Sequence, residues 1–178
     1  HVHPIIYGNT HMQNINRRSA LLKDYDRLET VYPLVNNEFY HPIEKPVARR
    51  QLNIDSSKKF ILFFGCSVLS EERKGMRYLM EALTLFHEQL TEEQRHSVLL
   101  LIAGQFAEEI IGKMPFEYRY LGYVDLTQLP TIYSAATAFV CPSVDDAGPS
   151  MVNQSLSCGT PVISFNIGTA SLDRKSVV

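Results

Sequence analysis

Five short apolar runs, spaced along the chain from about residue 58 onward, limit the possible fold more than any other feature. They cover residues 58–65, 97–104, 118–124, 137–143 and 160–165, and apolar residues recur at helical spacing over 76–90. Strands that are apolar throughout are buried on both faces, and their alternation with helices indicates a parallel sheet. We therefore predict an α/β fold with a doubly wound, Rossmann-like parallel sheet.

The first 55 residues follow this alternation less well. Residues 14–28 favour a helix with an exposed basic side, and Pro33, Pro42 and Pro46 indicate an extended linker that ends in a short helix. We therefore expect residues 1–55 to lie outside the sheet and residues 56–178 to be the main domain.

Charge and cysteine content exclude several classes of protein. The formal net charge is -2, which gives no general attraction to nucleic acid. Three distant cysteines do not make a disulfide framework, and we expect a cytoplasmic chain without a bound metal. The longest apolar runs are too short to span a bilayer. The N-terminus has neither an initiator Met nor the pattern of a signal peptide, so we expect a fragment or a trimmed chain.

The stretch "DDAGPSMVNQSLSCGTPVISF", residues 145–165, predicts an anion site. Pro149 suits the first turn of a helix and Gly159 the position just after its end, so we expect a short helix over 149–158. This helix would begin at the carboxyl edge of the sheet, where sites in such folds lie. Its first amides carry partial positive charge and suit a phosphate, and Gly148 lets the backbone approach a ligand closely.

Polar side chains surround this predicted helix start. Ser150 and Gln154 are four positions apart and share a helical face, from which they could offer hydroxyl and amide groups. Asp145 and Asp146 precede the helix, and carboxylates suit the hydroxyl groups of sugars. The alternative is structural: the aspartates compensate the helix dipole, and Ser150 and Gln154 form a solvated face.

The loop after the first predicted strand is the second candidate. Arg73 and Lys74 stand before Gly75 in "GCSVLSEERKGMRYL" and could neutralise a diphosphate, although a solvated charged loop is the alternative. The loop matches neither the GxxxxGK[ST] phosphate loop nor the GxGxxG dinucleotide fingerprint. We identify no catalytic Ser-His-Asp or Cys-His arrangement.

Four segments, taken in order, resemble the C-terminal half of a family 4 (group 1) glycosyltransferase. They are "ERKGMRYLMEAL", "LLLIAGQ", "YLGYVDLTQLPTIYSAATAFVCPS" and "DDAGPSMVNQSLSCGTPVISFNIGTA". The resemblance covers about residues 60–170, and "LETVYPLVNNEFYHP" is similar to the family's interdomain passage. It implies the donor-binding domain of a two-domain GT-B fold and retaining transfer from a nucleotide sugar. By the same resemblance, residues 1–55 are an interdomain segment with the end of an N-terminal domain, and residues 56–178 are the donor-binding domain, truncated at its C-terminus.

The resemblance also implies roles for particular residues. Asp145 or Asp146 matches the acidic position that contacts the donor sugar, and Lys74 matches the lysine that meets the diphosphate. Gln154 stands where an acidic residue usually holds the ribose, and Cys66 stands where an arginine is usual, so Arg73 is a substitute. The candidate catalytic residues are thus Asp145 and Asp146, and the candidate donor-binding residues are Arg73, Lys74, Gly122, Val124, Gly148, Ser150, Met151, Val152 and Gln154.

The expected partners follow from the same resemblance. They are a nucleotide-sugar donor, a sugar or lipid-linked acceptor held by an N-terminal domain, and a membrane surface where the acceptor is a lipid. No cofactor or metal is expected, and the fragment alone is expected to be inactive. Two alternatives stay open: a non-catalytic scaffold domain with this fold, favoured by Gln154 and Cys66, or an unrelated nucleotide-binding α/β enzyme.

Overall fold

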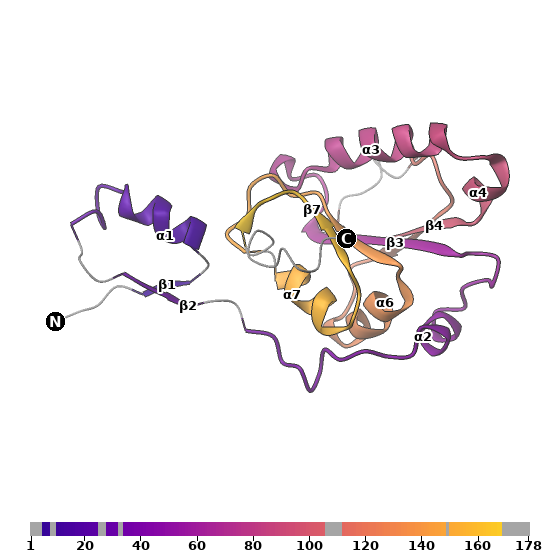
Figure 1. Cartoon of the computed structure of the whole chain (residues 1–178), viewed down its shortest axis with the longest axis horizontal. Helices are drawn as coiled ribbons and strands as arrows, with labels where there is room; N and C mark the ends of the chain where they lie inside the picture. Colours follow the sequence, from indigo (N-terminus) through magenta and orange to yellow (C-terminus); the bar gives the residue numbers. More distant parts are fainter. Residues whose placement is uncertain are drawn as a thin grey trace.

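A computed structural model describes residues 5–7, 10–24, 28–31, 34–105, 112–148 and 150–168. The body of the molecule is a five-stranded parallel sheet with helices on both faces (Figure 1). Its strands are β3 (Phe60–Val68), β4 (Val98–Gln105), β5 (Tyr118–Gly122), β6 (Ala138–Cys141) and β7 (Val162–Ser164). The predicted α/β fold with a doubly wound sheet is therefore confirmed.

The strand order β5-β4-β3-β6-β7 places the first strand of the sheet, β3, at its centre. The chain moves outward on one side through β4 and β5, then returns to the other side of β3 to form β6 and β7. All four pairings are parallel; Phe63, for example, pairs with Leu101 of β4 and Phe139 of β6. The order of the strands reverses between β3 and β6, and crevices at the carboxyl ends of such a pair are the usual ligand sites of this fold.

Helices of the body cover the two faces of the sheet, which is why all residues of β4 except the last are buried, whichever face they point to. Their bounds are α2 (Lys45–Gln51), α3 (Met76–Gln89), α4 (Glu92–His96), α6 (Leu129–Ala135) and α7 (Ser150–Ser157), with short 3₁₀ segments η1 (Glu72–Lys74) and η2 (Leu126–Gln128). Helix α3 lies on one face and α6, α7 and α2 lie on the other (Figure 1).

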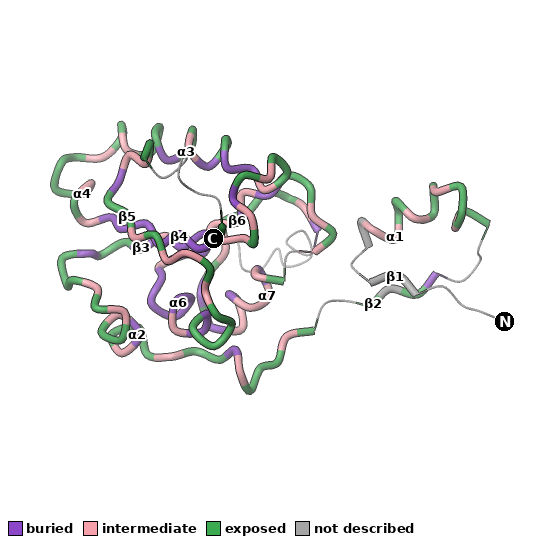
Figure 2. The backbone as a smooth tube through the Cα atoms, turned by 180° about the vertical axis from the view of Figure 1, so that it is seen from behind, coloured by how far each residue is buried: buried purple, intermediate pink, exposed green. Residues whose placement is uncertain are grey.

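Each face has its own apolar core. Phe64, Leu100 and Ile102 point toward Leu79 and Leu83 of α3. On the opposite face, a second cluster joins the sheet to α6, α7 and the segment before α2; its members include Tyr40, Phe63, Leu101, Tyr133, Phe139 and Val152. Figure 2 shows this burial concentrated along the sheet and the inner sides of the helices.

The N-terminal part of the chain forms a small unit of its own, with β1 (Ile5–Tyr7), α1 (Thr10–Arg17) and β2 (Glu29–Val31). The two strands pair in parallel, and α1 connects them in the sequence. The helix predicted over 14–28 was therefore misplaced, because α1 ends at Arg17 and turns follow it. From residue 34 the chain runs along the body (Figure 1), where Tyr40 is buried in the core.

Helix α4 was not predicted, although its signal is present. Thr91 Oγ1 accepts a hydrogen bond from Gln94 N, and Gln94 Oε1 accepts one from Thr91 N. This is the capping box of a helix start, and Thr-x-x-Gln is its sequence pattern. The pattern is "TEEQ", residues 91–94, directly after the helical spacing over 76–90.

Candidate functional site

Two loops meet at the carboxyl ends of β3 and β6, where the strand order reverses. The first loop carries η1 and leads from β3 into α3; the second leads from β6 into α7. Val144 N donates to Arg73 O at 2.9 Å, so the two loops are joined through their backbones. The sequence-predicted cations and the acidic pair, each placed after a strand, are thereby brought to one place.

Gly75 makes this close approach possible. Its φ of 71° lies in the left-handed region, and a Cβ there would come within 1.8 Å of the carbonyl oxygen of Pro142. No side chain fits, so Gly75 lets η1 sit directly against the start of the β6–α7 loop. The Lys-Gly pair of the sequence thus has a structural reason for its glycine.

Lys74 and Asp146 form the central contact of the site. Lys74 Nζ lies 2.7 Å from Asp146 Oδ2, and the two side chains are only 15% and 12% exposed. Arg73 is a weaker partner: its guanidinium is 3.7 Å from Asp146 Oδ2 and 2.6 Å from Glu71 Oε2. Both cations therefore already have carboxylate neighbours, and a bound anion would share them with Asp146 and Glu71.

Asp146 also organises the backbone before α7. Its Oδ1 accepts a hydrogen bond from Gly148 N at 3.2 Å, so its two oxygens bind the second loop and the cations of the first. Asp145 is exposed, in contrast to its neighbour. Of the two predicted acidic residues, Asp145 is the more accessible to a ligand, while Asp146 holds the loops together.

Helix α7 begins directly after these residues. It runs from Ser150 to Ser157, close to the predicted helix over 149–158; Pro149 lies outside the described residues. Gly159 follows it with φ 72°, the left-handed conformation expected of a residue just past a helix end. The predicted helix stop is confirmed.

The other predicted donor-binding residues of α7 differ in how exposed their side chains are. Ser150 is exposed, whereas Val152 is 2% exposed and belongs to the core. Met151 packs partly against the same core, so Met151 and Val152 offer a ligand their backbone amides. The first amides of a helix have no partner within it, which makes this helix start suitable for an anion.

Gln154 is half-buried and its side-chain oxygen is engaged with the core. The hydroxyl of Tyr133, on α6, donates to Gln154 Oε1 at 3.1 Å. Sequence reasoning placed Gln154 on one helical face with Ser150 but did not find this partner. Cys66, the other departure from the family pattern, is partly buried, and its thiol donates to Val68 O at 3.3 Å.

Gly122 and Val124 lie farther from this centre. Gly122 ends β5, the edge strand two positions from β3 in the sheet, and Val124 packs against the core. The structure therefore groups Arg73, Lys74, Asp145, Asp146 and Gly148 at the start of α7, with Gly122 and Val124 at the carboxyl end of the same sheet.

A groove of about 640 Å³ borders η1. Its lining includes Glu72, Arg73, Arg77, Lys113 and Val144. These residues come from the β3–α3 loop, α3 and neighbouring loops, and α7 contributes none of the lining within the described chain. The groove and the start of α7 are therefore adjacent but separate surfaces.

Comparison with known families accounts for this arrangement. The family model for glycosyl transferases group 1 matches residues 58–177, well over half of the chain. This chain belongs to the group 1 glycosyltransferase family. An uncharacterised glycosyltransferase of Methanocaldococcus jannaschii is 28% identical over 132 residues, which cover 70% of this chain and 32% of that relative. The chain thus spans about a third of that relative's length.

Solved structures give the same fold. Sucrose-phosphate synthase of Thermosynechococcus elongatus superposes with a TM-score of 0.71 at 21% identity, over 94% of this chain and 42% of that one. Anabaena HepE, solved with UDP and glucose, gives a TM-score of 0.69 at 14% identity, over 94% and 46%. The body of this group 1 chain has the α/β architecture of GT-B C-terminal domains.

The described residues contain neither a membrane-spanning helix nor a cluster of metal ligands. None of the helices there has the length and apolar character needed to cross a bilayer. Within the same residues, no group of three or more His, Cys, Asp or Glu side chains is arranged to hold a metal ion.

Proposed function

We propose that this chain binds a nucleotide-sugar donor at the carboxyl ends of β3 and β6, as the donor-binding part of a retaining, family 4-type glycosyltransferase that transfers a hexose. The observation that carries the proposal is the meeting of Lys74 and Arg73 with the acidic segment that opens α7. It is supported by membership of the group 1 family and by the likeness to HepE, which was solved with UDP and glucose.

The diphosphate would lie between Lys74 and the first amides of α7. Both groups favour negative charge, and a positioned cation and helix start stabilise the charge that develops on a departing nucleoside diphosphate. Asp145 is exposed and would accept hydrogen bonds from sugar hydroxyls, while Asp146 holds Lys74 in place. Gln154 would meet the ribose, and the backbone at Gly122 and Val124 the base. These roles need no metal ion or other cofactor.

The acceptor belongs to the same proposal. A sugar or lipid-linked acceptor would be held by an N-terminal domain, so this chain alone would bind donor without turning over. We place the reaction in the cytoplasm, with contact to a membrane surface where the acceptor is a lipid.

Titration calorimetry with UDP, GDP and ADP on the intact chain tests the binding step. One of the three nucleotides should bind, and Lys74→Ala should weaken that binding at least several-fold because a diphosphate contact is lost. Lys59→Ala is the matched control, since Lys59 is an exposed lysine at the opposite, amino end of β3. Failure of all three nucleotides to bind would reject the proposal, and equal affinities in the two variants would remove Lys74 from the site.

A non-catalytic binding domain with the same fold is the second candidate. Two positions favour it: Gln154 turns its oxygen toward Tyr133, and the Cys66 thiol is engaged with the backbone of its own strand. Neither position therefore presents a charge at the start of α7. Release of nucleoside diphosphate from a nucleotide sugar by the full-length protein with its acceptor would separate the candidates, because a scaffold domain gives none.

A further inference from the structure

Tyr133 is a buried polar residue in contact with Gln154 of the proposed donor site. The residue is 0% exposed, and its ring packs edge-on against Phe63 at 5.3 Å and Phe139 at 5.5 Å between centroids. Its carbonyl oxygen accepts a hydrogen bond from Thr160 Oγ1 at 2.6 Å. Backbone and ring are thus both fixed, so the phenolic oxygen has one position.

The partner atom fixes the direction of the hydrogen bond between Tyr133 and Gln154. Gln154 Oε1 can only accept, so the Tyr133 hydroxyl donates to it at 3.1 Å, and burial raises the pKa of the phenol and keeps it protonated. A side-chain amide is planar, with an accepting oxygen and a donating nitrogen on opposite sides of the same carbon. With its oxygen turned toward the core, Gln154 has two N–H donors on the side away from Tyr133.

The position of Gln154 on α7 would let these N–H donors contact a ligand bound at the start of the helix. Ser150, at the first residue of α7, is one helical turn away and exposed, and Gln154 itself is half-buried. A ligand that reached the start of α7 and lay along this face would meet the amide of Gln154 after the hydroxyl of Ser150.

We propose that Tyr133 is a positioning residue for nucleotide binding. It holds the Gln154 side chain so that its N–H groups, rather than its carbonyl oxygen, meet the ligand. The group recognised is therefore a hydrogen-bond acceptor, and the ribose hydroxyl oxygens of a nucleoside diphosphate fit it. The inference rests on the proposed donor-binding function, and it adds a residue from α6 that touches no ligand.

The test compares ribose and dideoxyribose nucleotides on the intact chain. Calorimetry first identifies which of UDP, GDP and ADP binds, and the same nucleotide is then titrated in its 2′,3′-dideoxy form. Tyr133→Phe removes one oxygen and should weaken the ribonucleotide by about three- to tenfold, the range for one neutral hydrogen bond. It should leave the dideoxy nucleotide unchanged, because that ligand lacks the hydroxyls.

Two further variants separate positioning from a general loss of structure. Gln154→Met keeps the length of the side chain and should lose the same preference for ribose, and adding Tyr133→Phe to it should cost no further affinity. Non-additivity of this kind is expected when one residue acts through the other. Tyr40→Phe removes a phenol from the same core and should leave both affinities unchanged.

The outcomes are distinct for the two proposals. An unchanged ribose preference in Tyr133→Phe, or an equal loss for both nucleotides, overturns the positioning role while donor binding stands. An unchanged preference in Gln154→Met overturns it as well and does not depend on the fold of the Tyr133 variant. If the unmodified chain binds none of the three nucleotides, both proposals fall.

Discussion

Lys74 Nζ and Asp146 Oδ2 lie 2.7 Å apart although the two residues are 72 positions apart in the chain. Their contact joins the loop after β3 to the loop after β6 at the point where the strand order reverses. Because both side chains are largely buried, removal of one leaves the other with a charge that water solvates poorly. The pair therefore stabilises the fold as well as the proposed site.

Lys74→Met should lower the free energy of unfolding by about 1.5–3 kcal/mol, the range for a hydrogen bond to a charged group. Asp146→Asn should also destabilise the chain, because its single amide oxygen can replace only one of the two carboxylate oxygens that accept from Lys74 and from Gly148 N. Chemical denaturation of both variants and of the double variant measures their coupling. Purely additive effects would show that the two side chains do not stabilise each other.

Gly75→Ala should destabilise the chain by more than about 3 kcal/mol, because losses of stability this large come from steric clashes and core defects. The added Cβ would meet the Pro142 carbonyl oxygen at 1.8 Å and would occupy a left-handed conformation. Gly112→Ala is the control, because a Cβ at Gly112 has nothing within 4 Å. Thermal melting of the two variants checks this, and similar melting temperatures would contradict the close packing of the loops.

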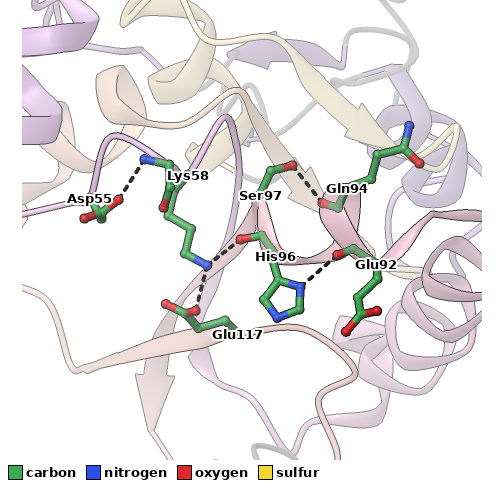
Figure 3. Close-up of polar contacts among 8 residues, drawn as sticks. Asp55, Lys58, Glu92, Gln94, His96, Ser97 and Glu117 are labelled. Atoms are coloured by element: carbon green, nitrogen blue, oxygen red, sulfur yellow. Dashed lines mark hydrogen bonds and ion pairs between the residues drawn. The ribbon is translucent and has the colours of Figure 1, made fainter.

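Lys58 should matter more to stability than its ion-pair partner Glu117. Lys58 Nζ donates to His96 O and lies 2.6 Å from Glu117 Oε2, which joins the amino ends of β3, β4 and β5 (Figure 3). The Lys58 side chain is 9% exposed, whereas that of Glu117 is 62% exposed.

Lys58→Met should therefore cost about 1–3 kcal/mol, since it leaves the His96 carbonyl without its donor. Glu117→Gln should cost less than about 1 kcal/mol, as is usual for a solvated partner. Urea denaturation of each variant measures both values. A larger loss in Glu117→Gln would reverse the assignment.

The cysteines should react slowly in the folded chain. Burial raises the pKa of Cys66 to about 11, with a smaller rise from Glu71 that the Lys74 charge opposes, and burial alone raises that of Cys158 to about 11. Burial also raises the pKa of Cys141. Thiolate is the reactive form, so alkylation by iodoacetamide at pH 8 should be at least about tenfold slower than in denaturant. Mass spectrometry of each cysteine peptide measures these rates.

The same shifts predict a loss of stability at alkaline pH. A thiol with a raised pKa favours the folded state while it is protonated, so its contribution is complete below the ordinary value of 9.0 and falls toward about 11. The free energy of unfolding should therefore decrease between pH 9 and pH 11, and Cys66→Ala should reduce that slope. A flat profile over this window would contradict the burial of the thiols.

Part of the proposed site was predictable because its signals are local. Apolar runs that alternate with helical spacing predicted the strands of the sheet, and Gly159 predicted the end of α7, since backbone conformation at a helix end depends on the residue that occupies it. The order of the two loops after β3 and β6 followed from the same alternation. The residue types of the two loops, cations in one and carboxylates in the other, are read directly from the sequence.

The tertiary structure decided which of these residues touch. The sequence alone determined an α/β chain with cations, carboxylates and a helix start at strand ends. It did not determine that Asp146 rather than Asp145 pairs with Lys74, or that Gln154 turns its oxygen toward Tyr133. Adjacent aspartates have the same chemistry and differ only in the direction of their side chains. A side-chain amide can turn either its oxygen or its nitrogen toward a neighbour. Residues that are distant in the sequence, such as Lys74 and Tyr133, decide between these alternatives once packing brings them close. A local sequence pattern does not contain that information.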